Sequence, residues 1–325
     1  MVAATMRARC APVAGLGTQQ RSFRAPRART GLGHTNGRAA RHYQIVTAAA
    51  AADTDIAALN DQFGIPGRVE VVAGLGGLPT VLLKHACGAS AEVTLFGACV
   101  TSWKQASGDE VLFMRPDALQ ILAGPDPNDA MQQHGFARNS DWSIAATSAD
   151  PQPDDQDPEV TLVLRDNDYT RKMWPHAFEV AYSVSLHGEL LQADMRVQNT
   201  GDKPFEFTAA LHSYIEVSDV AEAKVADPLN PTKKKEEREE VTFDGPTDSV
   251  YLKARDYVEL DVGTGAAVTV TTNKWSDVVV WSPWTAMPDC YRQFVCVESA
   301  QFSTPVSLKP GEFWRSQAEW SVMDL

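Results

Sequence analysis

The first 52 of the 325 residues contain no aspartate, glutamate or lysine, although they contain eight arginines. The whole chain has 29 basic and 42 acidic residues, so the remainder carries 21 basic against all 42 acidic groups, a net charge of −21. A body this negative repels the phosphate backbone of nucleic acids and the surface of anionic membranes. We therefore expect neither nucleic acid nor membrane among its partners.

Other absences exclude further classes of protein. Only five cysteines are present, without a Cys-x-x-Cys pair or a histidine pair at metal-ligand spacing, so neither zinc nor an iron–sulfur cluster is expected. There is no phosphate-binding glycine loop, no Gly-x-Ser-x-Gly motif and no apolar run of 18 residues. A hydrophobic content of 44% is too high for a disordered acidic chain. Cys99 and Cys296 lie in apolar alternating runs and are expected to be buried free thiols.

The acid-free, arginine-rich start is typical of an organelle transit peptide, and it lacks the apolar core of a secretory signal. A disordered basic arm is the alternative interpretation. We expect residues 1–52 to be disordered and to direct the chain to the plastid stroma, in preference to the mitochondrion. Residues 53–325 are expected to form a single β-sandwich domain.

From residue 68 onward the hydrophobic pattern alternates with a period of two, which is typical of strands. Only residues 54–61 have the spacing of a short helix, and segments 121–131 and 219–240 are predicted loops. The pattern predicts an all-β fold, a large antiparallel sandwich or barrel. The expected strands are residues 92–96, 98–103, 159–164, 177–185, 190–197, 205–217, 257–262, 267–272, 278–281 and 313–322.

Two polar residues stand out in apolar strands. His212 lies in residues 209–214 (AALHSY), where a buried histidine with a structural role is the alternative to a functional one. Glu298 follows residues 294–297 (FVCV), at a parity that places it on the same face as Cys296. A carboxylate on an apolar face is costly unless it is paired, and its pKa is perturbed there, so Glu298 is a candidate acid or base.

Five strings in this order resemble the glucose-6-phosphate 1-epimerases of the aldose 1-epimerase superfamily. They are residues 133–139 (QHGFARN), 210–214 (ALHSY), 247–251 (TDSVY), 279–284 (VVWSPW) and 294–298 (FVCVE). The resemblance extends over roughly residues 65–323. It implies a large antiparallel β-supersandwich of the galactose mutarotase type.

The resemblance also implies an activity and a site. His212 is the expected general acid and Glu298 the expected general base for opening and closing the sugar ring of a hexose 6-phosphate. The substrate-binding positions are Gln133, His134, Arg138 and Asp248. No metal and no cofactor is implied, the expected partner is the small-molecule substrate, and the chain is expected to be a monomer.

Two alternatives remain at this point. The interval 118–132 lacks the Gly-Gly-Ile-Pro and Phe-Pro-Gln-Phe-Gly stretch that family members carry there. A chain that lost turnover with that segment would be a non-catalytic carbohydrate-binding β-sandwich. A structural all-β protein with buried polar residues is the third possibility. The presence of both His212 and Glu298 favours the enzyme, because a binding module needs no acid–base pair.

Overall fold

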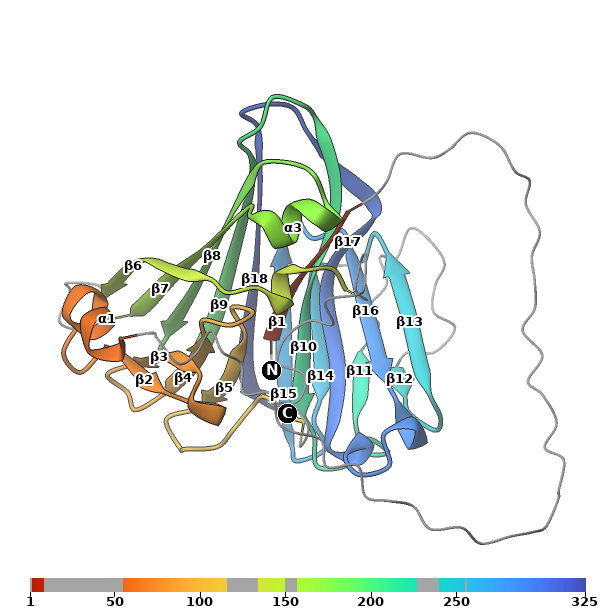
Figure 1. Cartoon of the computed structure of the whole chain (residues 1–325). Helices are drawn as coiled ribbons and strands as arrows, with labels where there is room; N and C mark the ends of the chain where they lie inside the picture. Colours follow the sequence, from red (N-terminus) through yellow and green to blue (C-terminus); the bar gives the residue numbers. More distant parts are fainter. Residues whose placement is uncertain (1, 9–54, 116–133, 150–156, 227–239, 255) are drawn as a thin grey trace, which may run out of the picture.

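The computed structural model describes residues 2–8, 55–115, 134–149, 157–226, 240–254 and 256–325. The strands in these ranges form two sheets of nine strands each, which pack as the layers of a sandwich (Figure 1). Every strand pairing between the named strands is antiparallel. The predicted all-β antiparallel fold is therefore confirmed.

The first sheet carries the candidate site residues of the described strands. Its order is β13-β16-β17-β10-β1-β5-β4-β3-β2. Its strands are β1 (Val2–Ala8), β2 (Val69–Ala73), β3 (Pro79–Lys84), β4 (Ser90–Thr94), β5 (Val100–Lys104), β10 (Phe205–Glu216), β13 (Thr247–Leu252), β16 (Asp277–Ser282) and β17 (Phe294–Leu308).

The second sheet has the order β12-β11-β14-β15-β18-β9-β8-β7-β6. Its strands are β6 (Ser143–Ala149), β7 (Pro158–Arg165), β8 (Phe178–His187), β9 (Leu190–Asn199), β11 (Lys224–Ala226), β12 (Glu240–Thr242), β14 (Tyr257–Asp261), β15 (Ala266–Asn273) and β18 (Phe313–Asp324). The helices are α1 (Ile56–Phe63) and α3 (Asp168–Met173), with short 3₁₀ turns η2 (Leu75–Gly77), η3 (Ala137–Asn139), η4 (Trp284–Ala286) and η5 (Tyr291–Gln293).

The core lies between the two sheets. Burial alternates along β9 without a break, because successive side chains of a strand point to opposite faces. The inward face of each sheet contributes large side chains with almost no exposed surface, among them Trp103, Tyr182, Phe207 and Trp320. A continuous apolar cluster joins both layers, and this rigid sandwich positions the side chains of β10 and β17.

Residues 2–8 differ from the expected disorder of the N-terminal segment. They form strand β1, which inserts between β10 and β5 in the first sheet. Seven residues of β1 pair with β10, with Ala3 opposite His212, whereas only Val2 pairs with β5. Residues 9–54 lie outside the described ranges, and the transit-peptide assignment stays a prediction.

Three local elements differ from the sequence prediction, and the caps of the two helices explain two of these differences. The predicted helix begins later, at Ile56, because the Asp55 side chain accepts the Ala58 N–H and caps it. Residues 224–226, predicted as part of a loop, form β11. Helix α3 was not predicted, and its start is a capping box in which Asn167 and Thr170 bond each other's backbone N–H groups.

Asp277 is a buried carboxylate (1% exposed) that ties the start of β16 to β17. It accepts the backbone N–H groups of Phe302 at 2.8 Å, Ser303 at 2.6 Å and Lys253 at 3.0 Å, and also the Ser303 hydroxyl at 2.7 Å. Burial raises its pKa, but these hydrogen bonds together hold that pKa below its ordinary value.

Replacement of Asp277 by asparagine is expected to lower the free energy of unfolding by about 2–4 kcal/mol. The NH₂ group of the asparagine side chain can only donate hydrogen bonds, so it would leave buried backbone N–H groups without an acceptor. Because the folded pKa is depressed, the carboxylate stabilises above its unfolded pKa of about 4 and loses this contribution as pH falls through the folded pKa. Urea unfolding measured from pH 7 to pH 3 should therefore show that the difference in unfolding free energy between the wild type and Asp277→Asn becomes smaller as the pH falls. The exposed Asp256→Asn variant is the control, and a difference that does not change with pH would contradict the assignment.

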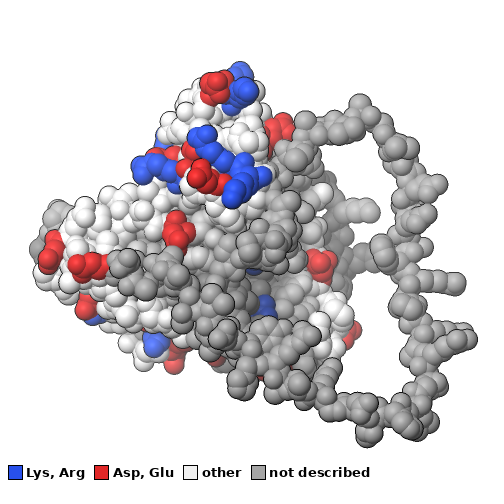
Figure 2. Space-filling view, viewed as in Figure 1, with Lys and Arg blue, Asp and Glu red and all other residues white. Residues whose placement is uncertain are grey.

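Charged side chains of both signs mix on the visible face of the molecule. Figure 2 shows lysines and arginines lying among acidic groups in the region of α3, where Arg171 pairs with Asp166 and Arg165 pairs with Glu179. Among the described residues, no helix has the length and apolarity needed to cross a membrane.

Candidate active site

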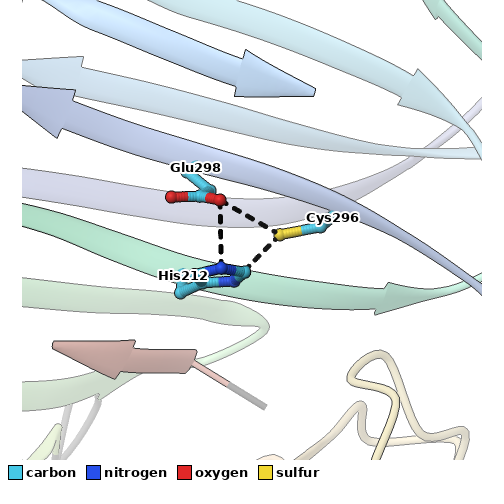
Figure 3. Close-up of side chains that lie close together, drawn as sticks. All are labelled: His212, Cys296 and Glu298. Carbon is cyan, nitrogen blue, oxygen red and sulfur yellow. Dashed lines mark hydrogen bonds and ion pairs between the residues drawn. The ribbon is translucent and has the colours of Figure 1, made fainter. Parts of the chain in front are cut away.

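His212 and Glu298 meet across the middle of the first sheet. Strands β10 and β17 pair so that the two residues are direct partners in the antiparallel ladder, and their side chains project from the same face. The Nε2 atom of His212 lies 3.1 Å from Oε1 of Glu298 (Figure 3). The two side chains are 13% and 8% exposed, so the contact is shielded from bulk water but not closed off.

Cys296 completes a triangle with this pair. Its Sγ lies 3.1 Å from Nδ1 of His212 and 3.8 Å from Oε1 of Glu298 (Figure 3). The sequence predicted a buried free thiol, which is confirmed, but it gave Cys296 no place in the site. The available signal was its parity, because Cys296 and Glu298 are two residues apart on one strand and therefore share a face.

The protonation of this triangle follows from its burial. Burial, and after it the positive charges of His134 and Arg138, lowers the pKa of His212 to about 3. Burial raises the pKa of Glu298 to about 8, and the charge of Asp248 adds to this while the Cys296 hydrogen bond opposes it. At neutral pH the resting pair is thus a neutral imidazole beside a protonated carboxyl group. Burial separates the two pKa values, but it places the proton on Glu298, the expected base, and not on His212, the expected acid.

The contacts of His212 indicate which of its nitrogens can take the proton of Glu298. Burial raises the pKa of Cys296 well above its ordinary value, so the sulfur keeps its proton. The protonated carboxyl group of Glu298 faces Nε2 and can donate to it only when Nε2 has a free lone pair. A neutral imidazole that accepts at Nε2 carries its own proton on Nδ1, which then donates to Sγ of Cys296.

Rings surround His212 on several sides. His134 approaches it edge-on with 5.2 Å between ring centroids, and Tyr214 and Trp281 lie at 5.3 and 6.5 Å. His134 has a φ of +68° and precedes Gly135 at +76°, so two left-handed residues turn the chain back toward β10. The structure therefore brings His134 to the acid–base pair, as predicted.

Arg138 lies on η3, which is held close to the turn before β5. The Gly97 N–H donates to the Ser140 carbonyl at 2.8 Å, and the Trp142 indole donates to the Ala137 carbonyl at 2.9 Å. A Cβ on Gly97 would lie 2.5 Å from the Arg138 carbonyl oxygen, and φ there is +74°, so only glycine fits. Burial lowers the pKa of Arg138, and its charge acts on His212. Arg138 therefore lies within electrostatic reach of His212, and its role in substrate binding stays a prediction.

Arg115 is not among the site residues predicted from the sequence. Its side chain hydrogen-bonds Tyr214, and its charge contributes to the lowered pKa of Arg138, so two guanidinium groups lie near one another beside β10. Sequence reasoning missed it because the residue lies outside the matching strings. Asp248, on β13, is exposed but close enough to raise the pKa of Glu298. Gln133 lies outside the described residues.

A separate cavity of about 650 Å³ is distinct from this site. It is lined in part by carboxylates, including Glu110, Glu189, Glu216 and Asp324, and by none of the predicted site residues. Several carboxylates around one cavity repel an anionic ligand. This cavity therefore does not suit an anionic ligand.

The site can move protons between two neighbouring groups that are held on rigid strands. It can also supply three metal-ligand atoms, from His212, Cys296 and Glu298, all within 4.8 Å of one another. An acid–base pair beside guanidinium groups suits ring opening of a sugar, because one group must remove the O1 proton while another protonates the ring oxygen.

Comparison with known proteins identifies the class. The family model for aldose 1-epimerase matches residues 122–321. A protein of Cenchrus ciliaris named "Putative glucose-6-phosphate 1-epimerase" is 36% identical over 291 residues, which cover 78% of this chain and 88% of the relative. The chain belongs to the aldose 1-epimerase family. It is an isomerase that interconverts the anomers of a sugar, and the non-catalytic alternative is not favoured.

Further relatives agree with this assignment. A protein of Salmonella typhimurium with the same name is 29% identical over 246 residues, 66% of this chain and 81% of the relative. The crystal structure of a mutarotase-class protein from that organism has a TM-score of 0.67 and 24% identity, covering 82% of this chain and all of that one. A galactose mutarotase-like protein from Clostridium acetobutylicum has a TM-score of 0.59 at 14% identity, with 79% and 98% covered. The galactose mutarotase-type sandwich expected from the sequence is confirmed.

Proposed function

We propose that this isomerase acts on glucose 6-phosphate or a closely related hexose 6-phosphate, with His212 and Glu298 as its acid–base pair. The observation that carries the proposal is the 3.1 Å contact between these residues beside the guanidinium groups of Arg115 and Arg138. The names of the sequence relatives also support a 6-phosphate substrate.

In the proposed reaction, Glu298 removes the O1 proton and His212 protonates the ring oxygen, which opens the ring. Rotation about C1–C2 presents the other face of the aldehyde, and the reversed transfers close the ring to the other anomer. A positioned acid and a positioned base each accelerate such a reaction by about 10²–10⁴-fold.

The resting pair holds its one labile proton on Glu298, so this proton passes to His212 before O1 can be deprotonated by the carboxylate. The contact between Nε2 and Oε1 provides the route. The charge of Arg138 lowers the pKa of His212, and a bound phosphate dianion neutralises that charge. Binding of a phosphorylated sugar therefore favours the protonated imidazole, whereas binding of the free sugar does not.

The substrate class is tested by anomer exchange measured with NMR saturation transfer on glucose 6-phosphate and on free glucose. We expect faster exchange of the 6-phosphate at equal concentration, because only that substrate pairs with the guanidinium groups. Equal or faster exchange of free glucose would remove the 6-phosphate from the proposal and leave the isomerase assignment in place.

The alkaline side of the pH profile follows from the raised pKa of Glu298. Between the two pKa values the pair holds one proton, and above about pH 8 Glu298 releases it, so that none is left for the ring oxygen. We expect kcat/KM for anomer exchange, which reports the free enzyme, to fall as pH rises through about 8. Measurement of kcat/KM between pH 6 and 10 checks this. A kcat/KM that stays constant to pH 10 would contradict the idea that the proton held by Glu298 is the one delivered to the ring oxygen.

A further inference from the structure

The triangle of His212, Cys296 and Glu298 has the composition of a metal site as well as of an acid–base pair. One imidazole nitrogen, one sulfur and one carboxylate oxygen lie within 4.8 Å of one another. The oxygen of Glu298 is 3.1 Å from Nε2 of His212, the sulfur of Cys296 is 3.1 Å from Nδ1 of the same ring, and the sulfur and the oxygen are 3.8 Å apart. Tetrahedral zinc, with bonds of about 2.0–2.3 Å, places its ligand atoms about 3.3–3.8 Å apart. The largest separation among the three atoms is at most 4.8 Å, so rotation of the side chains by about 1 Å would make them a zinc ligand set.

The scaffold holds these atoms in place without a metal. His212 and Glu298 are paired residues of β10 and β17, and Cys296 precedes Glu298 by two residues on the same face (Figure 3). Cys296 has no exposed surface and Glu298 is 6% exposed, so these two ligand groups have already lost most of their hydration on folding. A metal ion that enters therefore meets ligands whose desolvation and ordering were completed when the sheets formed.

The ligand types select the class of metal. A thiolate with an imidazole suits zinc and cobalt, whereas magnesium and calcium prefer oxygen ligands alone. The thiolate and carboxylate together balance the two positive charges of the ion. Three protein ligands leave a fourth position, as in zinc sites that accept an exchangeable ligand.

We infer that His212, Cys296 and Glu298 form an inhibitory binding site for a divalent transition metal of the zinc class. The bound ion takes the lone pairs of His212 and Glu298, and these are the lone pairs that carry protons in the proposed reaction. Binding releases the thiol proton of Cys296 and the carboxyl proton of Glu298 to the solvent, so no oxidant or reductant is needed. Metal occupancy and anomer exchange therefore exclude each other; the inhibition, though not the binding, rests on the proposed function.

Cobalt titration of the chelator-treated full chain tests the binding directly. Cobalt bound by a thiolate in tetrahedral geometry shows a charge-transfer band in the near ultraviolet and d–d bands in the visible. We expect both with one cobalt per chain, their loss on addition of zinc, and no effect of magnesium. The Cys296→Ser variant should lose the near-ultraviolet band, and Glu298→Gln should keep it with weaker affinity.

Cys87 provides the matched control, because its exposed thiol lies 3.0 Å from Nδ1 of His85 and offers a second cysteine–histidine pair. The Cys87→Ser variant should keep the full cobalt spectrum. Absence of the band in the wild type, or its loss in Cys87→Ser with retention in Cys296→Ser, would overturn the proposal.

Anomer exchange supplies the second readout. Zinc is expected to abolish exchange by the wild type and by Cys87→Ser, and EDTA is expected to restore it. The Cys296→Ser variant should exchange anomers at the same rate with zinc as without it. A chain that binds cobalt at Cys296 but shows no exchange even without metal refutes the proposed function alone. A chain that exchanges anomers equally well with and without zinc refutes the inhibitory site alone.

Discussion

Replacement of Glu298 by glutamine is expected to lower kcat for anomer exchange by about 10²–10⁴-fold, with a smaller change in KM. Glutamine has nearly the same shape but can neither accept the O1 proton nor hold the proton that the resting pair shares. His212→Gln should lower kcat by a similar factor, because the ring oxygen then loses its proton donor. The double variant should be little slower than either single variant, since the two groups act as one unit.

The controls separate chemistry from folding. Glu206 lies on β10 with an exposed side chain, so Glu206→Gln should leave kcat unchanged. Thermal unfolding of all variants checks that the sandwich is intact, and burying a neutral amide in place of the protonated Glu298 should cost little stability. Near-wild-type exchange by Glu298→Gln, in a folded protein, would refute the acid–base assignment while leaving the family assignment standing.

Replacement of Arg138 by methionine is expected to lower kcat/KM for glucose 6-phosphate by about 100-fold and to change kcat/KM for free glucose only slightly. Loss of charge-assisted hydrogen bonds to a phosphate costs about 1.5–3 kcal/mol for each bond. The same substitution removes a positive charge that lowers the pKa of His212, so exchange of free glucose is expected to rise modestly. Saturation-transfer rates on both sugars give the ratio directly.

Arg292 offers a matched substitution outside the site. It is exposed and paired with Asp219, and Arg292→Met should alter neither rate. An equal loss on both sugars in Arg138→Met would mean that Arg138 supports the fold of η3 and not the phosphate. Arg115→Met distinguishes the two guanidinium groups, because Arg115 contacts Tyr214 whereas the charge of Arg138 acts on His212.

The strands that carry the acid–base pair could be predicted because their signal is local. Alternation over residues 205–217 anticipates β10 to within one residue, and the face that Glu298 shares with Cys296 follows from the two-residue period of β17. Both residues lie within a run of apolar neighbours, so their polarity was conspicuous. The predicted set His134, Arg138, His212 and Glu298 is gathered in one place, with Asp248 within electrostatic reach.

The contacts between strands could not be predicted, because register depends on residues far apart in the chain. The pairing of His212 with Glu298 joins positions 86 residues apart, and nothing local specifies it. The same holds for the approach of Cys296 to Nδ1 of His212 and of Arg115 to Tyr214. The protonation order of the pair is also non-local, because it arises from burial that only the assembled sheets produce.

The place of β1 in the first sheet is incompatible with the predicted removal of the N-terminal segment. Its backbone occupies the place between β10 and β5, and Ala3 lies opposite His212. If the organelle cleaves the segment as the sequence predicts, the mature protein loses this strand, and the edge of β10 beside His212 is left without that partner. Cleavage would then remove not only the targeting segment but also one strand of the sheet that holds the reacting groups. Mass spectrometry of the N-terminus of the organellar protein would show whether the first sheet of the mature protein contains β1.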